Sequence, residues 1–310
     1  MKLNPMKNLI IFSSKLPAAK ELRQHLEKLP YTRIAETELE RAGFMPHHTT
    51  QDLVSEFPGG YSFMLGHEEK VLPASAVRSE CDRRIKEIRD RDGEEAMEGF
   101  DFDNFKEITK QELIKRALVK STAIQAYYHI ESERLFVATA SKRMASVLMG
   151  QLVKVMEAVE TKTIHINGAK RGLTARLITR IQNDHDALDA FGMFEVGEYC
   201  RLTRTQDGHK EVINYTGIDV ASCDELLERL DSNFQVETLA LNWRGLGFKI
   251  THDFMLKGVK WADTDEPDFA DAIEAWSHDA AVKVELLSSA TKELITIMEY
   301  REESEQEQAA

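Results

Sequence analysis

The side chains best suited to chemistry are carboxylates in two short polar runs. Asp101 and Asp103 stand two residues apart in one run. Asp184 and Asp186 flank a histidine in the other, directly after a helical pattern. Carboxylate oxygens are the usual ligands of Mg²⁺, and a two-metal nuclease needs several of them converging from separate elements, with the ions about 4 Å apart. These four residues predict one alternative function, a metal-dependent DNA exonuclease, while each run alone is also typical of a polar loop.

His47 and His48 form a second pair with metal-ligand chemistry. Adjacent residues of an extended segment point to opposite faces, and the pair lacks the one-turn helical spacing of an HExxH site. We therefore expect a polar loop here. The chain also lacks a GxxxxGK[ST] phosphate loop, a GxGxxG turn, a GxSxG elbow and paired-cysteine zinc motifs. We expect no cofactor, no bound metal and no catalytic residue of a standard ATPase, dehydrogenase or hydrolase.

Basic residues gather in the middle of an acidic chain of 310 residues whose net charge is −13. Between Lys106 and Arg180 there are fourteen Lys or Arg residues against six Glu and no Asp, a net charge of +8. The rest of the chain then holds 26 basic and 47 acidic residues, a net charge of −21. Affinity for nucleic acid comes largely from Lys and Arg that displace phosphate counterions. The cationic middle third therefore predicts a DNA-binding surface, with contacts to the backbone and not to the bases.

The candidate phosphate contacts share a position on the polar side of predicted helices or at their ends. Between Lys162 and Arg180 no acidic residue is interleaved, which makes that cluster the sharpest of them. The full set of predicted DNA-binding residues is Lys115, Arg116, Lys120, Lys142, Arg143, Lys154, Lys170, Arg171, Arg176 and Arg180. A third hypothesis reads the acidic flanks differently: a protein-binding inhibitor whose anionic surface mimics DNA.

The elements that must position these side chains are mixed. Alternating apolar residues between Phe234 and Trp261 predict a three-stranded antiparallel meander. Apolar residues at helical spacing predict helices over 75–91, 105–123, 144–159 and 173–181. The first two of these would form a protruding helical arm. The predicted class is α+β, with mixed or antiparallel sheets and flanking helices.

Four regions follow from this order of elements. Residues 1–74 would form the N-terminal part of a central α/β region, 75–124 the helical arm or tip, 125–182 the central region with the cationic helices, and 183–310 a C-terminal sheet and helix region, the base. Finer patterns predict a short helix over 37–41, a hairpin of 61–65 with 70–72, a strand over 281–286 and a last helix from Leu287.

Three cysteines without a CxxC pair are typical of a reducing compartment. The apolar run Leu9–Phe12 is too short for a signal peptide or a membrane span. We therefore expect a cytoplasmic, nucleoid-associated protein without membrane contact.

Several of these stretches resemble the recombination-associated protein RdgC family. They are Leu239 to Trp243, the closing Val259-Lys260-Trp261, Lys7-Asn8-Leu9, Glu68 to Pro73, and the segment from Val282 to Tyr300, in the same order. The resemblance runs nearly from end to end and marks the chain as a distant member. It implies a homodimeric ring around DNA that binds single and double strands with little sequence preference and restrains RecA-mediated recombination.

Two positions depart from the family pattern. The resemblance implies a phenylalanine near the tip of the arm and a Lys-Gln pair on a finger near the C-terminal sheet. This chain has Val119-Lys120 and Gly217-Ile218 in those places. Lys120 or Lys210 would have to supply the missing contacts.

Overall fold

The computed structural model describes residues 6–156, 160–163, 169–182, 190–262 and 269–298; for 160–163 and 169–171 it describes the secondary structure alone. The chain folds into two compact units. The larger holds Leu3–Lys28, Pro46–Met64 and Ile124–Ala310, and the smaller holds Met1–Lys2, Leu29–Met45 and Leu65–Ala123. Within the described residues the fold is α+β, with a large antiparallel sheet and seven α-helices, which confirms the predicted class.

The sheet of the larger unit follows the strand order β5-β6-β1-β12-β11-β10-β8-β9, with β3 paired to β4 and β7 paired to β1. Its strands are β1 (Asn8–Lys15), β3 (Val54–Phe57), β4 (Gly60–Val71), β5 (Leu118–His129), β6 (Arg134–Val137), β7 (Glu160–Thr163), β8 (Glu195–Gln206), β9 (His209–Thr216), β10 (Gln235–Trp243), β11 (Leu246–Thr251) and β12 (Met255–Lys260). The outer parts of β4 and β5 belong to the smaller unit. The predicted meander is confirmed as β10, β11 and β12.

Helices of the larger unit bury apolar stripes. They are α1 (Ala19–Leu26), α4 (Lys142–Met156), α5 (Ala169–Gln182), α6 (Asp224–Asp231) and α7 (Ala272–Ile297), with a short 3₁₀ turn η3 (Val220–Ser222). Leu173 and Leu177 of α5, together with Val284 and Leu287 of α7, enter one core with the apolar side chains of β10 to β12. Because these helices pack on the sheet through one stripe, their other sides stay available for polar residues.

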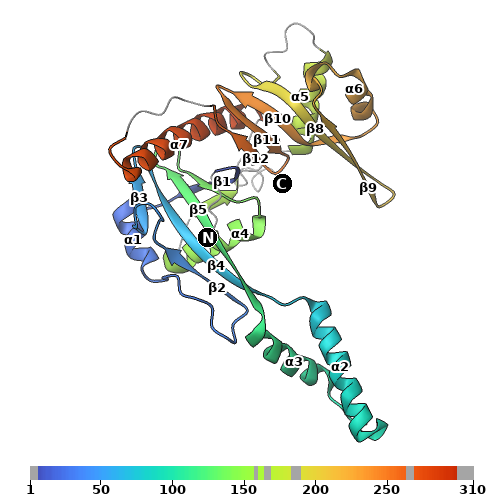
Figure 1. Cartoon of the computed structure of the whole chain (residues 1–310). Coiled ribbons are helices and arrows are strands. Elements are labelled where there is room, and N and C mark those ends of the chain that lie inside the picture. The colour runs from blue at the N-terminus through green and yellow to red at the C-terminus, as the bar shows by residue number, and fades with distance from the viewer. Residues whose placement is uncertain (1–5, 157–159, 164–168, 183–189, 263–268, 299–310) are drawn as a thin grey trace, which may run out of the picture. The chain divides into compact units, whose positions relative to one another are not determined.

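The smaller unit contains β2 (Glu40–Met45), α2 (Ala74–Asp92), the 3₁₀ turn η1 (Glu94–Met97) and α3 (Phe102–Arg116), beside the outer parts of β4 and β5. Figure 1 shows α2 and α3 running side by side as a helical pair, which we call the arm. Asp101 caps α3, because its side chain accepts a hydrogen bond from the backbone N–H of Asn104 at 3.0 Å.

Several predicted boundaries are wrong. The helix predicted to end at residue 123 ends at Arg116, and one twelve-residue strand, β5, follows it. The predicted hairpin of 61–65 with 70–72 is the single strand β4. The predicted short helix at 37–41 gives way to β2, and the predicted strand at 281–286 lies inside the 26-residue helix α7. Within the described residues, no helix is both long and apolar enough to cross a membrane.

Candidate nucleic-acid interface

Arg83 and Arg84 of α2 are neutralised by acids of the arm. Arg83 donates to Glu80 at 2.7 Å and also reaches Glu87, while Arg84 bonds Glu80 at 2.7 Å and Glu112 at 2.6 Å. Hydrogen bonds from Arg83 and Arg84 lower the pKa of Glu80 to about 2, so this carboxylate stays charged at neutral pH. Because each cation has an anionic neighbour, this face offers little net attraction for a phosphate chain.

The end of α3 differs from α2. Lys115 and Arg116 are both exposed, and within the described part of the chain neither makes an ion pair or a hydrogen bond. Lys120, just beyond on β5, is held by Glu69 of β4 at 2.9 Å. Of these three predicted contacts, Lys115 and Arg116 therefore present uncompensated charge and Lys120 does not.

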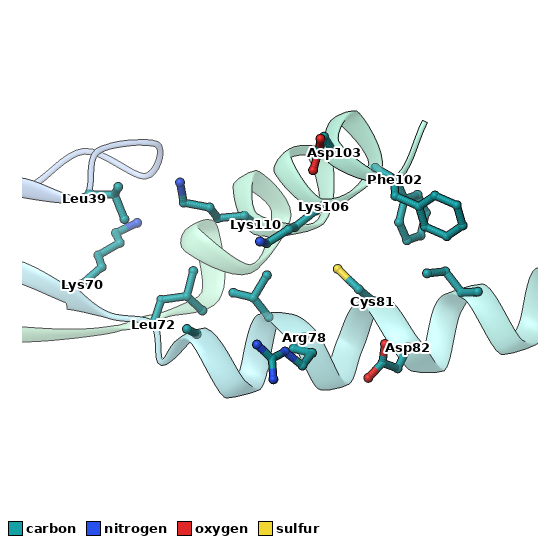
Figure 2. Close-up of a pocket in the computed structure, with 14 residues that line it drawn as sticks. Leu39, Lys70, Leu72, Arg78, Cys81, Asp82, Phe102, Asp103, Lys106 and Lys110 are labelled. Carbon is teal, nitrogen blue, oxygen red and sulfur yellow. The ribbon is translucent and has the colours of Figure 1, made fainter. Parts of the chain in front are cut away.

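A pocket of about 610 Å³ opens between α2 and α3. Its lining combines apolar side chains, among them Cys81 and Phe102, with four cations and the two acids Asp82 and Asp103. Figure 2 shows Cys81 projecting from α2 toward α3, with Lys106 of α3 facing the same space. Of the four cations, Arg78 and Lys106 make no ion pair or hydrogen bond inside the described residues. We call this space, whose cations are Lys70, Arg78, Lys106 and Lys110, the arm pocket.

Neither Arg78 nor Lys106 is among the ten predicted contacts. Arg78 lies in a run of alternating charges that predicted a compensated face, and only the fold shows that its neighbours pair elsewhere. The sequence did contain a signal for Lys106, because this lysine is the first residue of the cationic segment from Lys106 to Arg180.

Helix α4 carries three predicted contacts on its polar side. Its apolar stripe, which includes Leu148 and Leu152, is buried. Arg143 and Lys154 are exposed and stand eleven residues apart, about three helical turns, so they share one face. Lys142 is also exposed, but Asp253 holds its ammonium group at 2.7 Å.

The arginines of α5 do not have equal surroundings. Arg176 is half-buried, and its guanidinium donates a hydrogen bond to the carbonyl oxygen of Ala190 at 2.9 Å. Arg180, one turn further on, is half-buried and makes no hydrogen bond or ion pair among the described residues. The side chains of Lys170 and Arg171 lie outside the described residues.

Of the four carboxylates considered for metal chemistry, the structure describes Asp101 and Asp103. Asp101 is engaged as the cap of α3, and Asp184 and Asp186 lie outside the described residues. No group of three or more His, Cys, Asp or Glu side chains suited to a metal ion occurs in the described ranges.

The histidine pair behaves differently from the prediction in one respect. The rings of His47 and His48 lie close together, with centroids 4.4 Å apart, and do not point to opposite faces. His47 is buried against Trp276, and its Nδ1 accepts a hydrogen bond from the backbone N–H of Thr49 at 3.2 Å. The pair therefore stabilises a turn.

The structure thus supplies patches of exposed, uncompensated cations. Three of the ten predicted contacts belong to the smaller unit and seven to the larger.

Comparisons with known proteins agree with one another. A family model described as "Putative exonuclease, RdgC" matches residues 6–300. The "Recombination-associated protein RdgC" of Neisseria meningitidis serogroup C (strain 053442) is 26% identical over 253 residues, covering 80% of this chain and 81% of the relative. Proteins of the same name from Psychromonas ingrahamii and Colwellia psychrerythraea are 24% and 25% identical, covering 87% and 89% of this chain and 90% of each relative. Since the family model matches nearly the whole chain, this protein belongs to the RdgC family.

Proposed function

We propose that the protein binds DNA through the phosphate backbone, in double-stranded and single-stranded form, as a ring-shaped homodimer that inhibits RecA-type homologous recombination. Its relatives are named recombination-associated proteins. A protein of net charge −13 can hold a polyanion only where positive charge is locally concentrated. The cationic middle third supplies that concentration.

One observation carries the proposal: several cations of the middle third are unpaired among the described residues, whereas Arg83 and Arg84 of α2 are paired. Lys115, Lys154 and Arg180 lack ion pairs among the described residues, whereas Arg83 and Arg84 of α2 are each bound to two acids. A cation already paired gains little from a phosphate, because it must first give up its carboxylate. An unpaired one releases counterions from DNA on binding.

The homodimer is supported by apolar side chains that the smaller unit leaves in solvent. Leu118 is 80% exposed, and Val71 and Val119 are close to half exposed. Val119, which the resemblance matched to a phenylalanine near the tip of the arm, lies at the start of β5, after the arm. Exposed apolar groups on one unit are typical of an interaction surface. A second copy of the chain is the partner that we propose for them.

The test is a titration of labelled DNA by fluorescence anisotropy at several salt concentrations. We expect the logarithm of the binding constant to fall linearly with the logarithm of salt, by about 0.9 for each phosphate contact on a duplex, and two unrelated sequences to bind alike. The triple variant Lys115→Ala, Arg116→Ala, Lys154→Ala should bind at least about tenfold more weakly at low salt and lose part of the slope.

The matched control removes three positive charges from the compensated face, as Arg83→Ala, Arg84→Ala and Arg91→Ala. Its affinity should stay within about threefold of the original protein, because these guanidinium groups are bound to acids of the arm. Equal losses in both variants would show that net charge, and not the proposed surface, governs binding.

Two further measurements test the homodimer and the effect on recombination. Light scattering should give twice the mass of one chain, and added protein should slow RecA-driven strand exchange.

Two other functions would give different results in the same assays. The family description favours an exonuclease as the alternative, and shortening of end-labelled DNA with Mg²⁺ or Mn²⁺ would establish it. A DNA-mimicking inhibitor would bind the recombinase and leave labelled DNA unbound at every salt concentration.

A further inference from the structure

A serine, a histidine and a carboxylate form a continuous hydrogen-bonded row in the larger unit. The Oγ of Ser132 lies 2.8 Å from Nδ1 of His129, and Nε2 of the same ring lies 3.1 Å from Oε2 of Glu285. His129 ends β5, Ser132 stands in the turn to β6, and Glu285 comes from α7. The fold therefore joins residues 156 positions apart into a nucleophile, a base and a group that orients the base.

The hydrogen-bond network fixes the position of the ring proton. The backbone N–H of Ser132 lies 3.3 Å from Nδ1 of His129 and can only donate. Nδ1 must then be an acceptor, and in the neutral ring the proton sits on Nε2, where the Glu285 carboxylate accepts it. The ring is thus oriented by the carboxylate through Nε2 and offers its lone pair to the serine through Nδ1.

The serine proton also has a defined direction. The hydroxyl of Ser288, on α7, donates to Ser132 Oγ at 2.9 Å. With that lone pair occupied, the O–H of Ser132 is directed to Nδ1 of His129. The same contacts also stabilise the β5–β6 turn.

These groups line a pocket of about 370 Å³, a volume typical of a small-molecule site. His129 is buried at 5% exposure, while Ser132 is half-buried and Glu285 is exposed. Two cations, Arg134 and Lys292, line the same pocket. The carboxylates of Glu131 and Glu285 line it as well, so the formal charges of the pocket balance. The site therefore combines a buried base, a reachable hydroxyl and the ammonium group of Lys292, and it is too small for a duplex.

We propose that Ser132, His129 and Glu285 are the catalytic triad of an esterase that acts on small carboxylic esters with an anionic substituent. Ser132 Oγ attacks the carbonyl carbon and gives its proton to Nδ1 of His129. The ester C–O bond then breaks, and the alcohol leaves with that proton. Water attacks the acyl-serine, giving its own proton to Nδ1, and the acid departs as Ser132 regains a proton.

The remaining residues have distinct roles in this proposal. Glu285 keeps the ring in the productive tautomer, and Lys292 holds the anionic substituent. Esters are favoured over amides because an alkoxide leaves more readily than an amine. The activity is separate from DNA binding, since it uses none of the cations proposed for that surface.

The first test uses the full-length protein with a biotinylated fluorophosphonate, followed by peptide mass spectrometry. We expect one adduct, on Ser132, and none after denaturation of the protein. Ser132→Ala should abolish labelling. Thr296→Val should keep it, because it removes a hydroxyl of the same pocket that donates to the backbone carbonyl of Lys292 and to no member of the triad. A folded protein that gives no adduct on Ser132 overturns the proposal, and so does equal labelling of the Ser132→Ala variant.

The second test measures hydrolysis of 4-nitrophenyl acetate and 4-nitrophenyl hemisuccinate. Ser132→Ala and His129→Gln should each lower kcat/KM at least about 100-fold, with circular dichroism confirming the fold. Lys292→Ala should raise KM about tenfold for the hemisuccinate and leave the acetate unchanged, a difference that a merely structural lysine would not produce. Turnover that survives in Ser132→Ala contradicts the assignment.

Discussion

Lys142 at the start of α4 forms an ion pair with Asp253, with 2.7 Å between Nζ and Oδ2. This contact places an acid beside one of the cations proposed to meet DNA. The substitution Asp253→Asn removes the acid and keeps its size, so Lys142 becomes available to phosphate. We expect this variant to bind labelled DNA about two- to fivefold more tightly at low salt, with a steeper salt dependence.

The control for that prediction is Lys142→Ala alone. Because Asp253 already neutralises the ammonium group, its removal should weaken binding less than Lys154→Ala does, since Lys154 has no such partner in the described residues. If both lysine variants lose affinity equally, the ion pair does not limit access to DNA.

Substitutions of Arg176 and Arg180 on α5 should have different effects, the first on the free energy of unfolding and the second on DNA affinity. Arg176 donates to the carbonyl of Ala190, so Arg176→Ala leaves a peptide oxygen without that partner and should lower the free energy of unfolding by about 1 kcal/mol. Arg180→Ala should leave stability within about 0.5 kcal/mol and reduce DNA affinity. Urea unfolding and anisotropy on the same samples check both effects. Equal stability of the two variants would contradict the role given to Arg176.

His47 predicts a loss of stability in mild acid. Burial lowers the pKa of His47 to about 4, with a smaller effect of the neighbouring His48. Between pH 6.5 and pH 4, His47 is therefore protonated in the unfolded chain and neutral in the folded one. The free energy of unfolding is highest above pH 6.5 and declines as the pH falls. We expect a loss on the order of 2 kcal/mol by pH 4.5, measured by urea unfolding.

Replacement of the imidazole provides the control. The variant His47→Gln keeps an acceptor for the N–H of Thr49 and does not titrate in this range. Its stability should change less between pH 6.5 and pH 4.5 than that of the original protein. Glu80, whose pKa is lowered to about 2, loses its contribution to stability only below pH 4.5. The pH ranges in which His47 and Glu80 affect stability therefore barely overlap. Parallel curves for both proteins would exclude His47 as the source.

The sequence predicted correctly those strands and helices whose apolar residues recur at a regular spacing, two residues for a strand and three to four for a helix. In the meander of β10, β11 and β12, buried and less buried residues alternate over 239–243 and 246–250, and turn residues separate the strands, which is why it could be placed from sequence. Strand β4 could not, because Glu68 interrupts it with a charge. In the fold that carboxylate accepts hydrogen bonds from the Tyr31 hydroxyl and the Ile34 N–H, both at 2.7 Å, and the strand continues through it.

The other wrong predictions also arise because contacts between residues far apart in the sequence decide the structure. Val282 and Val284 favour a strand locally, yet α7 runs through them because one side of it fits the core. Charge can be counted in a sequence, but its pairing cannot: the partners Lys120 and Glu69 are 51 residues apart. For this reason the sequence predicted a cationic region and did not distinguish its paired members from its unpaired ones.

The arm pocket yields the last prediction. Arg78 and Lys106 line it from opposite helices, and neither is paired among the described residues. If the arm contacts DNA, these two exposed side chains are available to phosphate, as are Lys115 and Arg116. The double variant Arg78→Gln, Lys106→Gln should therefore weaken binding about three- to tenfold and reduce the salt slope by up to about two contacts. Anisotropy measures both quantities.

A matched variant on the same two helices is Arg83→Gln with Lys110→Gln, whose charges are paired with Glu80 and Glu107. It removes the same net charge from the arm, so long-range electrostatics change equally in both double variants. A difference in DNA affinity between the two double variants must then come from direct contact with phosphate. We expect the paired variant to bind nearly as well as the original protein. A loss equal to that of the Arg78 and Lys106 variant would assign the arm a role through its overall charge, and the DNA contacts would then lie on α4 and α5.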